Sequence, residues 1–489
     1  MRRTKIVATL GPASDRPTVL RRMIEGGVNV FRLNFSHGEG DDHRRRANEV
    51  RKIAKELNAT VAVLADLQGP KIRIACFRDE FVNLKKGASF ALDSSVDKND
   101  GDVDRVGLDY PELSKDCSNG DFLLLDDGHI VLEVIQVFST GRVCTEVVQG
   151  GKLSNNKGIN KLGGGLSAPA LTEKDYADMD IISEIDADYV AISFPRDARD
   201  MQLARKALKQ RGSDAFLMAK IERAEAVATD IGLDGLILAS DAVMVARGDL
   251  GVEIGDDGLI GVQKKIIARS RALDRPVVTA TQMMESMISS SMPTRAEIFD
   301  VANAVLDGTD AVMLSAETAI GDYPVEVVLA MAKTAEGAEL TDEAQALGAR
   351  VDAEYGRRDE AIALGAMYIA GHLKNLSAII CITESGSTPL WMSRSGSRLP
   401  IIAWSNQPKT LSKMALFRGV SPLRFDPPPS QSMSYVDKLV VRIVSSHLKL
   451  PNDSQVILTR GDRLNMPGGT STLKIMVVGD AENAAESTS

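Results

Sequence analysis

The stretch Met218-Ala-Lys-Ile-Glu222 is apolar and typical of a β-strand until its last residues, where charge appears. Lys220 and Glu222 are two residues apart, so the alternation of side chains along a strand places them on the same face. A second stretch, Met244-Val-Ala-Arg-Gly-Asp-Leu-Gly251, also ends in charge, and Asp249 is its carboxylate. A lysine beside one carboxylate, with a second carboxylate one strand later, suits a divalent metal and an anionic substrate. Two ordinary surface ion pairs at strand ends would give the same pattern. The two interpretations can be distinguished only with the rest of the sequence.

Short apolar segments of this kind recur along the chain and mostly alternate with helical patterns. Eight of them are Lys5–Leu10, Asn29–Phe35, Thr60–Leu67, Tyr189–Phe194, Ala215–Ile221, Ala242–Ala246, Pro276–Thr281 and Ala311–Ser315. This alternation predicts an α/β fold with a closed (β/α)₈ TIM barrel. An open doubly wound sheet is the alternative, but Gly163-Gly-Gly165 follows no predicted strand, so no dinucleotide fingerprint supports it.

The sequence predicts further domains inside and after the barrel. After the third strand the pattern changes to short strands with turns, including a hairpin at Asp127-Gly128, and it returns through a Gly- and Asn-rich hinge. After the barrel, a helix and several strands indicate a separate α/β domain. We expect barrel segments at 1–69 and 167–342, an inserted β-rich lid domain at 70–166, an α/β effector domain at 343–478 and a disordered tail at 479–489.

Composition excludes several classes of protein. The net charge of −9 argues against a broad nucleic-acid-binding face, which would need to be basic. The four cysteines are scattered and form no disulfide framework, which is typical of a reducing compartment. No apolar run approaches the roughly 18 residues of a membrane span, and the first apolar run is too short for a signal peptide. We therefore expect a cytoplasmic protein without a membrane partner.

Polar residues gather at the ends of the predicted strands. Barrel enzymes carry their chemistry at the carboxyl ends of the strands, so polar residues at most of the eight ends predict an active site at the barrel mouth. These residues are Thr9, Arg32, Asn34, Ser36, Asp66, Lys220, Glu222, Arg247, Asp249, Thr281, Ser315 and Glu317.

The residue types at these ends favour phosphoryl chemistry assisted by a metal. Glu222 and Asp249 offer hard oxygen ligands suited to Mg²⁺ or Mn²⁺, whereas the five histidines of the chain argue against zinc. Arg32, Arg73 and Lys220 supply the positive charge that stabilises a phosphoryl group during transfer.

A second part of the mouth suits a carboxylate. The backbone amides around Gly248 and Asp249 could hold it, helped by the Thr281 hydroxyl. Thr281 and Ser315 could also relay a proton. Alternatively, each hydroxyl could bond to its own backbone.

Several motifs together resemble those of the pyruvate kinases. The resemblance runs in order from Thr4 to a last strand near Val478. The motifs are Asn29-Val-Phe-Arg-Leu-Asn-Phe-Ser-His-Gly38, Asp66-Leu-Gln-Gly-Pro-Lys-Ile-Arg73, Ser154-Asn-Asn-Lys-Gly-Ile-Asn160, Met218-Ala-Lys-Ile-Glu222, Val245-Ala-Arg-Gly-Asp-Leu-Gly251, Ala280-Thr-Gln-Met-Met-Glu-Ser-Met287 and Met313-Leu-Ser-Ala-Glu-Thr318.

The resemblance implies transfer of a phosphoryl group from phosphoenolpyruvate to ADP, giving pyruvate and ATP. It implies that Arg32 contacts the phosphate and that Lys220 stabilises the transferring group and the enolate. It also implies Mg²⁺ (or Mn²⁺) at Glu222 and Asp249. The substrate carboxylate would be held by Gly248, Asp249 and Thr281.

The same resemblance implies a nucleotide site and a route for protonation. Arg73, His37 and Lys157 would reach the nucleotide, with Asn34 beside them, and Lys157 would arrive when the inserted domain closes. Ser315 with Thr281 would protonate the enolate.

One departure from the family pattern concerns the monovalent cation. Many members need K⁺, held by residues that match Asn34, Ser36, Asp66 and a carbonyl, with Thr where Leu67 stands and Glu where Lys71 stands. A lysine ammonium can take the place of a monovalent cation. The chain thus resembles the K⁺-independent branch, and we expect that K⁺ is not required. Alternatively, Lys71 is an exposed lysine without a role.

The α/β domain contains a candidate effector loop, Thr383-Glu-Ser-Gly-Ser-Thr388, between a strand and a helix. Free amides and hydroxyls at a helix start form an anion site, and in the family this position binds a phosphorylated effector. A plain helix cap is the alternative. We expect a sugar phosphate or nucleotide effector, and a homotetramer. The residues expected to bind the effector are Thr383, Ser385, Gly386, Ser387 and Thr388.

Two other functions fit parts of the pattern. A lyase or mutase acting on phosphoenolpyruvate or pyruvate would also use a Mg²⁺-bound enolate, but the nucleotide candidates His37, Arg73 and Lys157 argue against it. A non-catalytic effector-binding protein would be expected to lack the charged residues of the barrel mouth, and the chain retains them.

Overall fold

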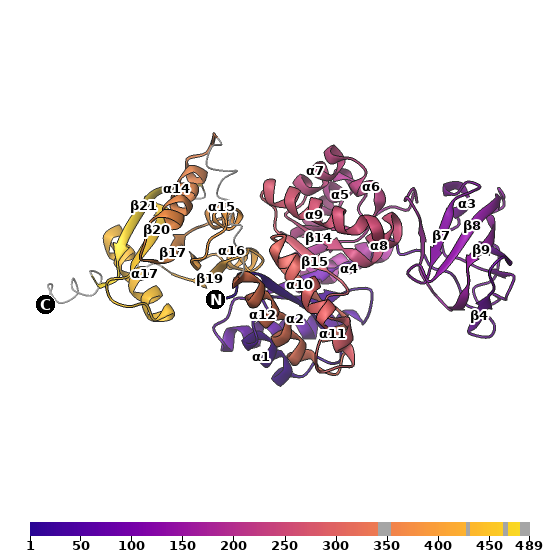
Figure 1. Cartoon of the computed structure of the whole chain (residues 1–489), viewed down its shortest axis with the longest axis horizontal. Coiled ribbons are helices and arrows are strands. Elements are labelled where there is room, and N and C mark those ends of the chain that lie inside the picture. The colour runs from indigo at the N-terminus through magenta and orange to yellow at the C-terminus, as the bar shows by residue number, and fades with distance from the viewer. Residues whose placement is uncertain (341–353, 427–430, 463–467, 480–489) are drawn as a thin grey trace.

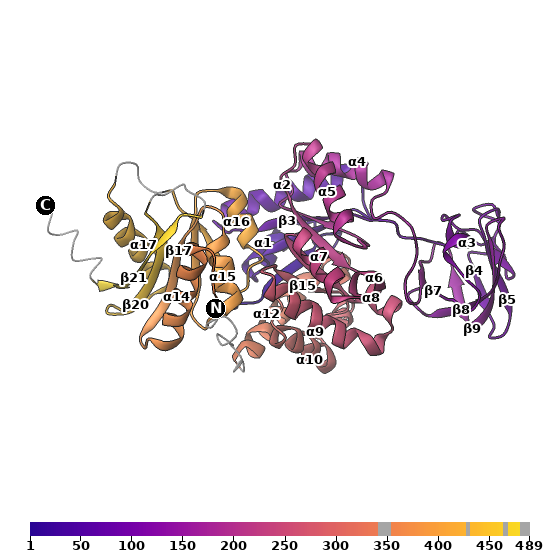
Figure 2. The ribbon, with the colours of Figure 1, turned by 90° about the horizontal axis from the view of Figure 1, so that it is seen from above.

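The computed structural model describes residues 1–340, 354–426, 431–462 and 468–479. The molecule is elongated, with an α/β domain at one end, a barrel in the middle and a β-rich domain at the other end (Figures 1 and 2). Of the predicted disordered tail, residues 480–489 lie outside the described residues, and so does the predicted start of the α/β domain at 343.

Within the described residues, eight parallel strands close into a barrel. Closure follows from the first strand, which pairs with the second on one side and with the last on the other. The predicted barrel is therefore confirmed and the open sheet is excluded. The strands are β1 (Lys5–Thr9), β2 (Val30–Asn34), β3 (Ala62–Asp66), β12 (Tyr189–Ile192), β13 (Phe216–Ile221), β14 (Ala242–Ala246), β15 (Val277–Ala280) and β16 (Ala311–Leu314).

Helices surround the barrel and bury the outer face of each strand, which explains why most residues of the strands are apolar. In β1 and β14 every residue is buried. The helices are α1 (Pro17–Glu25), α2 (Gly40–Glu56), α4 (Glu173–Glu184), α5 (Ala198–Gln210), α6 (Ala224–Val227), α7 (Asp230–Ala239), α8 (Arg247–Ile254), α9 (Asp256–Ala272), η1 (Glu285–Ile288), α10 (Arg295–Leu306), α11 (Ala316–Ala319) and α12 (Pro324–Leu340).

Between β3 and α4 the chain forms a β-rich inserted domain with its own apolar core. The predicted hairpin at Asp127-Gly128 joins β7 to β8, which pair antiparallel, and Asp126, Asp127 and Gly128 have positive φ angles. The elements are β4 (Phe81–Leu84), β5 (Ser89–Asp93), β6 (Arg105–Val106), α3 (Leu113–Asp116), β7 (Phe122–Leu125), β8 (Ile130–Val137), β9 (Arg142–Gln149), β10 (Gly151–Ser154) and β11 (Ile159–Lys161).

The C-terminal domain is a mostly parallel sheet of five described strands, ordered β19-β18-β17-β20-β21, with helices packed against it. The sequence reasoning missed β19, an edge strand that contains Pro422. Proline is tolerated at a sheet edge but weakens the strand signal. The elements are α14 (Arg358–His372), β17 (Leu376–Ile382), α15 (Ser387–Ser395), β18 (Ile401–Ser405), α16 (Pro408–Met414), β19 (Val420–Arg424), α17 (Met433–Leu448), β20 (Gln455–Gly461) and β21 (Thr470–Val477).

A buried ion pair joins the barrel to the C-terminal domain. Arg394, in the last turn of α15, donates to Asp310 just before β16, with Nη1 2.9 Å from Oδ2. Asp310 also accepts hydrogen bonds from the backbone amides of Val277 and Arg418. The carboxylate therefore ties two barrel strands and two segments of the other domain together.

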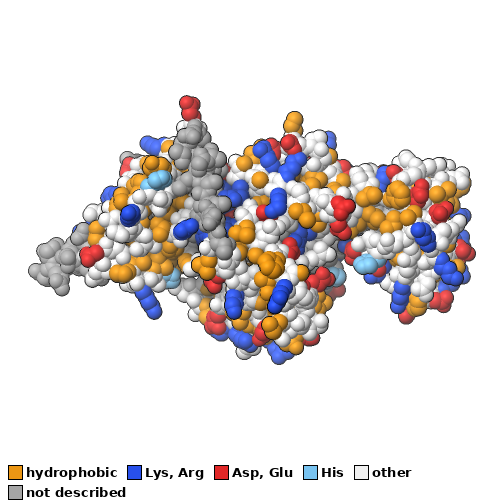
Figure 3. Space-filling model, in the orientation of Figure 1, with side chains coloured by type: hydrophobic (Ala, Val, Ile, Leu, Met, Phe, Trp, Pro, Cys, Tyr) orange, Lys and Arg blue, Asp and Glu red, His pale blue; other side chains and the backbone are white. Residues whose placement is uncertain are grey.

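Acidic and basic side chains are interspersed over the face seen in Figure 3. Across the described residues, no helix combines the length and the apolar character needed to cross a membrane.

Candidate active site

The charged residues of the barrel mouth come together because parallel strands end on the same side of the barrel. Arg32 lies on β2, Asp66 ends β3, and Lys220 lies near the end of β13. Glu222 follows β13 directly, and Asp249 lies in the first turn of α8, which begins where β14 ends. These five side chains form what we call the mouth cluster.

Lys220 is the centre of the mouth cluster. Its Nζ lies 2.9 Å from Glu222 Oε1, 3.3 Å from Asp66 Oδ1 and 2.7 Å from the hydroxyl of Ser193. Burial alone would lower the pKa of the Lys220 ammonium, but the carboxylates of Asp66 and Glu222 outweigh burial and hold this pKa above its ordinary value. Lys220 is therefore a fixed positive charge.

Arg32 and Asp66 form a second buried pair beside Lys220. Arg32 Nε donates to Asp66 Oδ2 at 2.6 Å, and Arg32 Nη1 donates to the Thr9 hydroxyl at 3.1 Å. Burial would raise the pKa of Asp66, but the charges of Lys220 and Arg32 lower it below its ordinary value. Asp66 thus remains ionised and orients both cations.

Glu222 differs from Asp66 because its environment disfavours its charge. Its side chain is 1% exposed, and burial raises the pKa of Glu222 to about 7, with Asp249 adding to the rise and Lys220 opposing it. One oxygen faces Lys220, and the other accepts the Phe194 backbone amide at 2.7 Å. A bound divalent cation would favour the ionised form.

Ser193 is a site residue that the sequence reasoning missed. Its hydroxyl accepts from Lys220 and donates to the Leu67 carbonyl at 2.7 Å. Gly69 packs closely over it, since a Cβ at that glycine would lie 2.8 Å from Ser193 Cβ. The available signal was a serine one residue after the fourth barrel strand, which looked uninformative beside charged strand ends.

The start of α8 is tied to the turn after β15. The Gly248 amide donates to the Thr281 hydroxyl at 3.0 Å, and that hydroxyl donates to the Ala280 carbonyl at 2.7 Å. Thr281 has a positive φ of 67°. Arg247 stabilises this conformation by donating to the Thr281 carbonyl and to Asp300. The Thr281 hydroxyl therefore accepts from one backbone group and donates to another in this structure.

Lys71 contacts the mouth cluster through Asp249. Its Nζ lies 3.6 Å from Asp249 Oδ1. Among the described residues it makes no ion pair or hydrogen bond with Asn34, Ser36 or Asp66, the other residues predicted for a cation site. The Asn34 side chain accepts the backbone amide of Ser36 at 3.2 Å.

Two predicted nucleotide residues, Arg73 and Lys157, make their contacts within the chain that leads into and through the inserted domain. Arg73 Nη1 donates to the Asn156 carbonyl at 3.1 Å, and Lys157 Nζ pairs with Asp126 at 2.7 Å. The adjacent Gly158 lies near the mouth, because a Cβ there would be 3.5 Å from Lys71 Cε.

For two other predicted residues, Ser315 and His37, the structure describes hydrogen bonds of the backbone amides. The backbone amide of Ser315 donates to Glu317 Oε2 at 2.6 Å, and the Ser315 hydroxyl has no partner among the described residues. His37 lies in the turn after β2, where its amide donates to the Asn34 carbonyl at 3.2 Å.

A divalent metal fits the donor set. Within the described residues, no three His, Cys, Asp or Glu side chains gather closely enough to hold a metal by themselves. Mg²⁺ commonly takes only one or two protein carboxylates and completes its shell with water and substrate oxygens. Glu222 and Asp249, on neighbouring elements, are suited to this arrangement.

The predicted effector loop forms a compact turn before α15. The Gly386 amide donates to the Thr383 hydroxyl at 3.0 Å, and the Ser385 and Ser387 hydroxyls lie 3.0 Å apart. Gly386 has a φ of 76°, which glycine adopts without strain. The Thr388 hydroxyl shares a hydrogen bond with that of Thr470. Two serine hydroxyls thus stand at the start of a helix.

Comparison with known proteins identifies the family. A family model described as pyruvate kinase, barrel domain, matches residues 1–328, and one described as pyruvate kinase, alpha/beta domain, matches residues 360–476. Pyruvate kinase II of Salmonella typhimurium is 53% identical over 98% of this chain and 99% of its own length. A pyruvate kinase of Haemophilus influenzae is 56% identical over 86% of this chain and 88% of its own, and one of Corynebacterium glutamicum is 39% identical over 99% of both. The chain therefore belongs to the pyruvate kinase family and is an enzyme of the phosphotransferase class.

Proposed function

We propose that this chain transfers the phosphoryl group of phosphoenolpyruvate to ADP and releases pyruvate and ATP. The observation that carries the proposal is the contact of Lys220 with both Asp66 and Glu222 at the mouth of the barrel, in a chain of this family. The ester P–O bond of phosphoenolpyruvate breaks, and a new P–O bond forms to a terminal oxygen of ADP. The enolate left behind then takes a proton at carbon.

Arg32 and Lys220 bind the transferring group. Both are cations held by Asp66, so their positions are fixed before the substrate arrives. Positive charge that is placed in advance stabilises the negative charge on the phosphoryl oxygens and on the departing enolate oxygen without further reorganisation. Lys220 serves as the main catalytic charge.

Glu222 and Asp249 hold Mg²⁺, or Mn²⁺ in its place. When bound, the cation would neutralise charge on substrate oxygens. The carboxylate of the substrate lies against the amides of Gly248 and Asp249 and the hydroxyl of Thr281. The Gly248 amide and the Thr281 hydroxyl are bonded to each other in this structure, so the substrate has to replace that bond.

Protonation of the enolate involves Ser315 and Thr281. The free hydroxyl of Ser315 supports this role. The Thr281 hydroxyl donates to the Ala280 carbonyl and would have to turn away from it. A Ser315→Ala variant tests the assignment: we expect phosphoryl transfer to persist while solvent proton uptake into pyruvate slows, and equal slowing of both steps would contradict it.

The nucleotide lies between the barrel and the inserted domain. Arg73, His37, Lys157 and Asn34 contact it, and Lys157 leaves Asp126 to do so when the inserted domain closes. The nearness of Gly158 to Lys71 supports a short closing movement.

The reaction does not require K⁺. The positive charge of Lys71 beside Asp249 supports this proposal. Rates measured in tetramethylammonium salts, without K⁺ or Na⁺, should match those in K⁺. Lys71→Glu should lose activity without K⁺ and regain it with K⁺. A wild-type rate that falls by orders of magnitude without K⁺ would refute the proposal.

A phosphorylated metabolite activates the enzyme through the loop at 383–388. The paired hydroxyls of Ser385 and Ser387 at the start of α15 support an anion site there. Ser385→Glu with Ser387→Glu should abolish activation by sugar phosphates and AMP, measured as the half-saturating phosphoenolpyruvate concentration. Unchanged activation would exclude the loop.

The assembly and the location follow the family. We expect a homotetramer, which light scattering at working concentration checks. A cytoplasmic setting fits the four cysteines, all free in the structure.

An assay coupled to lactate dehydrogenase, run with and without ADP, tests the central proposal. Pyruvate should form only when ADP and Mg²⁺ are both present. Pyruvate formation independent of ADP would favour the lyase or mutase instead.

A further inference from the structure

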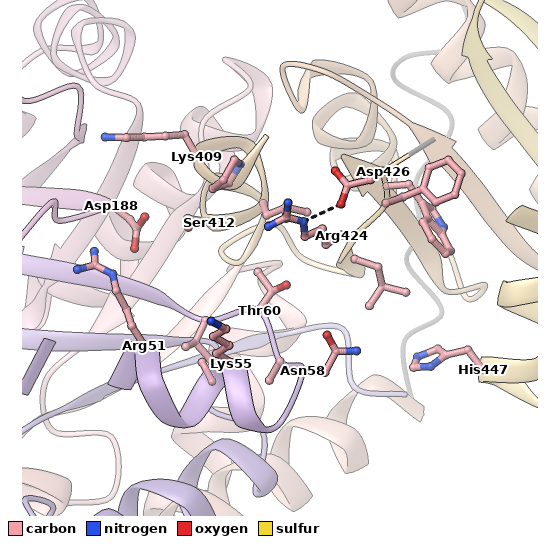
Figure 4. Close-up of a pocket in the computed structure, with 18 of the residues that line it drawn as sticks. Arg51, Lys55, Asn58, Thr60, Asp188, Lys409, Ser412, Arg424, Asp426 and His447 are labelled. Atoms are coloured by element: carbon pink, nitrogen blue, oxygen red, sulfur yellow. Dashed lines mark hydrogen bonds and ion pairs between the residues drawn. The ribbon is translucent and has the colours of Figure 1, made fainter. Parts of the chain in front are cut away.

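The two outer domains are attached to the barrel in different ways. The C-terminal domain lies directly against the barrel, where Arg51 and Lys55 of the barrel lie across a cavity from Arg424 and His447 (Figure 4). The inserted domain extends away from the barrel and is joined to it by two chain connections (Figure 2). The contacts made by these connections therefore have a large share in setting the position of the inserted domain.

The second connection, residues 163–168, binds to a buried arginine, and we call it the return segment. Arg223 Nη1 donates to the Leu166 carbonyl at 2.9 Å, and Arg223 Nη2 donates to the Ala168 carbonyl at 3.3 Å. Arg223 is 4% exposed, so water has little access to these hydrogen bonds. A guanidinium presents its donors in a rigid fork, and here the fork holds two carbonyls of the return segment.

Arg223 directly follows Glu222, one of the two residues proposed to hold the metal. The Glu222 side chain contacts Lys220 at 2.9 Å in the mouth cluster, whereas the Arg223 side chain lies against the return segment. The backbone of Arg223 is extended, with φ of −108° and ψ of 145°. Neighbouring side chains of an extended chain point to opposite sides. A fixed Arg223 side chain therefore limits how far the main chain of Glu222 can move.

The helix that carries the second proposed metal ligand contacts the same place. α8 contains Asp249 in its first turn and Glu253 one turn later. Glu253 Oε2 accepts the Ala224 amide at 2.8 Å, and the Glu253 carbonyl accepts the Gly163 amide at 2.8 Å. α8 therefore binds both the return segment and the chain just after Arg223.

The return segment also fits closely against the start of α6. Gly164 has a φ of 77°, and a Cβ there would lie 2.7 Å from Glu225 Oε2, so only glycine fits without strain. The neighbouring Gly165 amide donates to Glu225 Oε1. The segment is thus shaped to bind this part of the barrel as well as to connect the two domains.

We propose that Arg223 is a positioning residue for the reaction. By holding two carbonyls of the return segment, Arg223 fixes Glu222 where it binds the divalent cation and couples cation binding to the position of the inserted domain. The proposal rests on the proposed metal site at Glu222 and Asp249. Arg223 touches neither substrate nor cation, and it acts through Glu222.

Arg223→Lys tests the positioning, because it keeps the positive charge and replaces the fork by a single nitrogen. Binding of Mn²⁺ to the full-length protein without substrates is measured from the electron paramagnetic resonance signal of the free ion. We expect the dissociation constant to rise at least about fivefold, because a hydrogen bond to a charged group is lost and Glu222 is free to shift. Thermal unfolding checks that the variant folds.

Arg196→Lys is the matched control, because Arg196 holds the same segment from another place. Arg196 Nη1 donates to the Ser167 carbonyl at 3.3 Å, between the two carbonyls that Arg223 holds, and Arg196 also pairs with Asp200. Arg196 is not next to a proposed metal ligand in the chain. This variant should keep the Mn²⁺ dissociation constant within about twofold of wild type.

Amide hydrogen exchange of the return segment tests the coupling. Detachment of the segment would displace Glu222, so bound Mn²⁺ should oppose detachment by the same factor, because linkage is reciprocal. At saturating Mn²⁺, exchange in residues 163–168 should slow about threefold or more in wild type and in Arg196→Lys. In Arg223→Lys, saturating Mn²⁺ should not slow this exchange.

The outcomes separate this proposal from the proposed function. Wild-type Mn²⁺ affinity in Arg223→Lys, or wild-type exchange that does not respond to Mn²⁺, would overturn the positioning role and leave the metal site intact. Equal weakening of Mn²⁺ binding in both arginine variants would assign the effect to general loosening of the segment and would also overturn that role. Mn²⁺ binding by Glu222→Gln as tight as that of wild type would refute the proposed metal site, and the role of Arg223 would be refuted with it.

Discussion

Ser193→Ala is the sharpest test of the proposed catalytic arrangement, because it removes one oxygen and leaves every charge in place. The Ser193 hydroxyl receives a hydrogen bond from Lys220 at 2.7 Å and gives one to the Leu67 carbonyl. Ser193 is 1% exposed, so water cannot readily replace the lost oxygen. The variant therefore leaves a lysine N–H and a carbonyl without partners.

The magnitude follows from these two bonds. A hydrogen bond to a charged group contributes about 1.5–3 kcal/mol. If Ser193 holds Lys220 in the position that stabilises the transition state, kcat should fall by roughly 10- to 150-fold. The KM for phosphoenolpyruvate should change less, since Arg32 and the backbone amides still bind the substrate.

The assay is initial rate against phosphoenolpyruvate at saturating ADP and Mg²⁺, coupled to lactate dehydrogenase. Ser193→Thr keeps the hydroxyl and is the matched control, with thermal unfolding to check that both variants fold. We expect the threonine variant to recover much of kcat. A Ser193→Ala variant with kcat within twofold of wild type would refute the view that this hydroxyl positions Lys220.

Three further perturbations test other parts of the structure. Burial raises the pKa of Glu253 to about 7, so its stabilising contribution is present below about pH 4.5 and is lost as pH rises through 7. As pH rises from 5 to 8, the thermal stability of wild type should therefore fall relative to that of Glu253→Gln. A difference in stability between the two proteins that stays constant with pH would contradict this. Arg394→Met leaves Asp310 buried without its cation and should cost about 3–5 kcal/mol in urea unfolding; a loss below about 1 kcal/mol would show that the backbone amides suffice. Asp126→Asn frees Lys157 and should lower the KM for ADP about two- to threefold, and an unchanged KM would argue against contact of Lys157 with the nucleotide.

The fold was largely predictable because the barrel strands carry strong local signals. Each is a short apolar run, and its polar end coincides with the point where the observed strand stops, as at Asp66 and Glu222. The barrel closes where β1 pairs with β16, for example at Lys5 and Ala311, which are far apart in the chain. No local pattern indicates this pairing, and it was expected only from the number of strands and their alternation with helices. The edge strand β19 was missed because its proline, Pro422, weakens the local strand signal.

The candidate site was predictable in its residue types but not in its pairings. Lys220 was expected beside Glu222 from spacing alone, whereas its contacts with Asp66 and Ser193 depend on β3 and β12, which lie beside each other and near β13 only in the closed barrel. The partner of Lys71 was likewise not predictable from the sequence. The sequence suggested a cation position, and the only ion pair that the structure describes for it is with Asp249.

The charges of the mouth explain why substrate and metal should enter together. Three cations, Arg32, Lys220 and Lys71, face three carboxylates, Asp66, Glu222 and Asp249, so their formal charges cancel. An anionic substrate that binds alone would compete with the buried carboxylates for the cations. A divalent cation that binds alone would be repelled by the nearby ammonium groups. Bound together, each offsets the charge that the other introduces. We therefore expect positive coupling: Mg²⁺ should tighten phosphoenolpyruvate binding, and phosphoenolpyruvate should tighten Mg²⁺ binding by the same factor, because linkage is reciprocal. Titration calorimetry in both orders measures the two factors, and independent binding would show that the mouth does not act as one electrostatic unit.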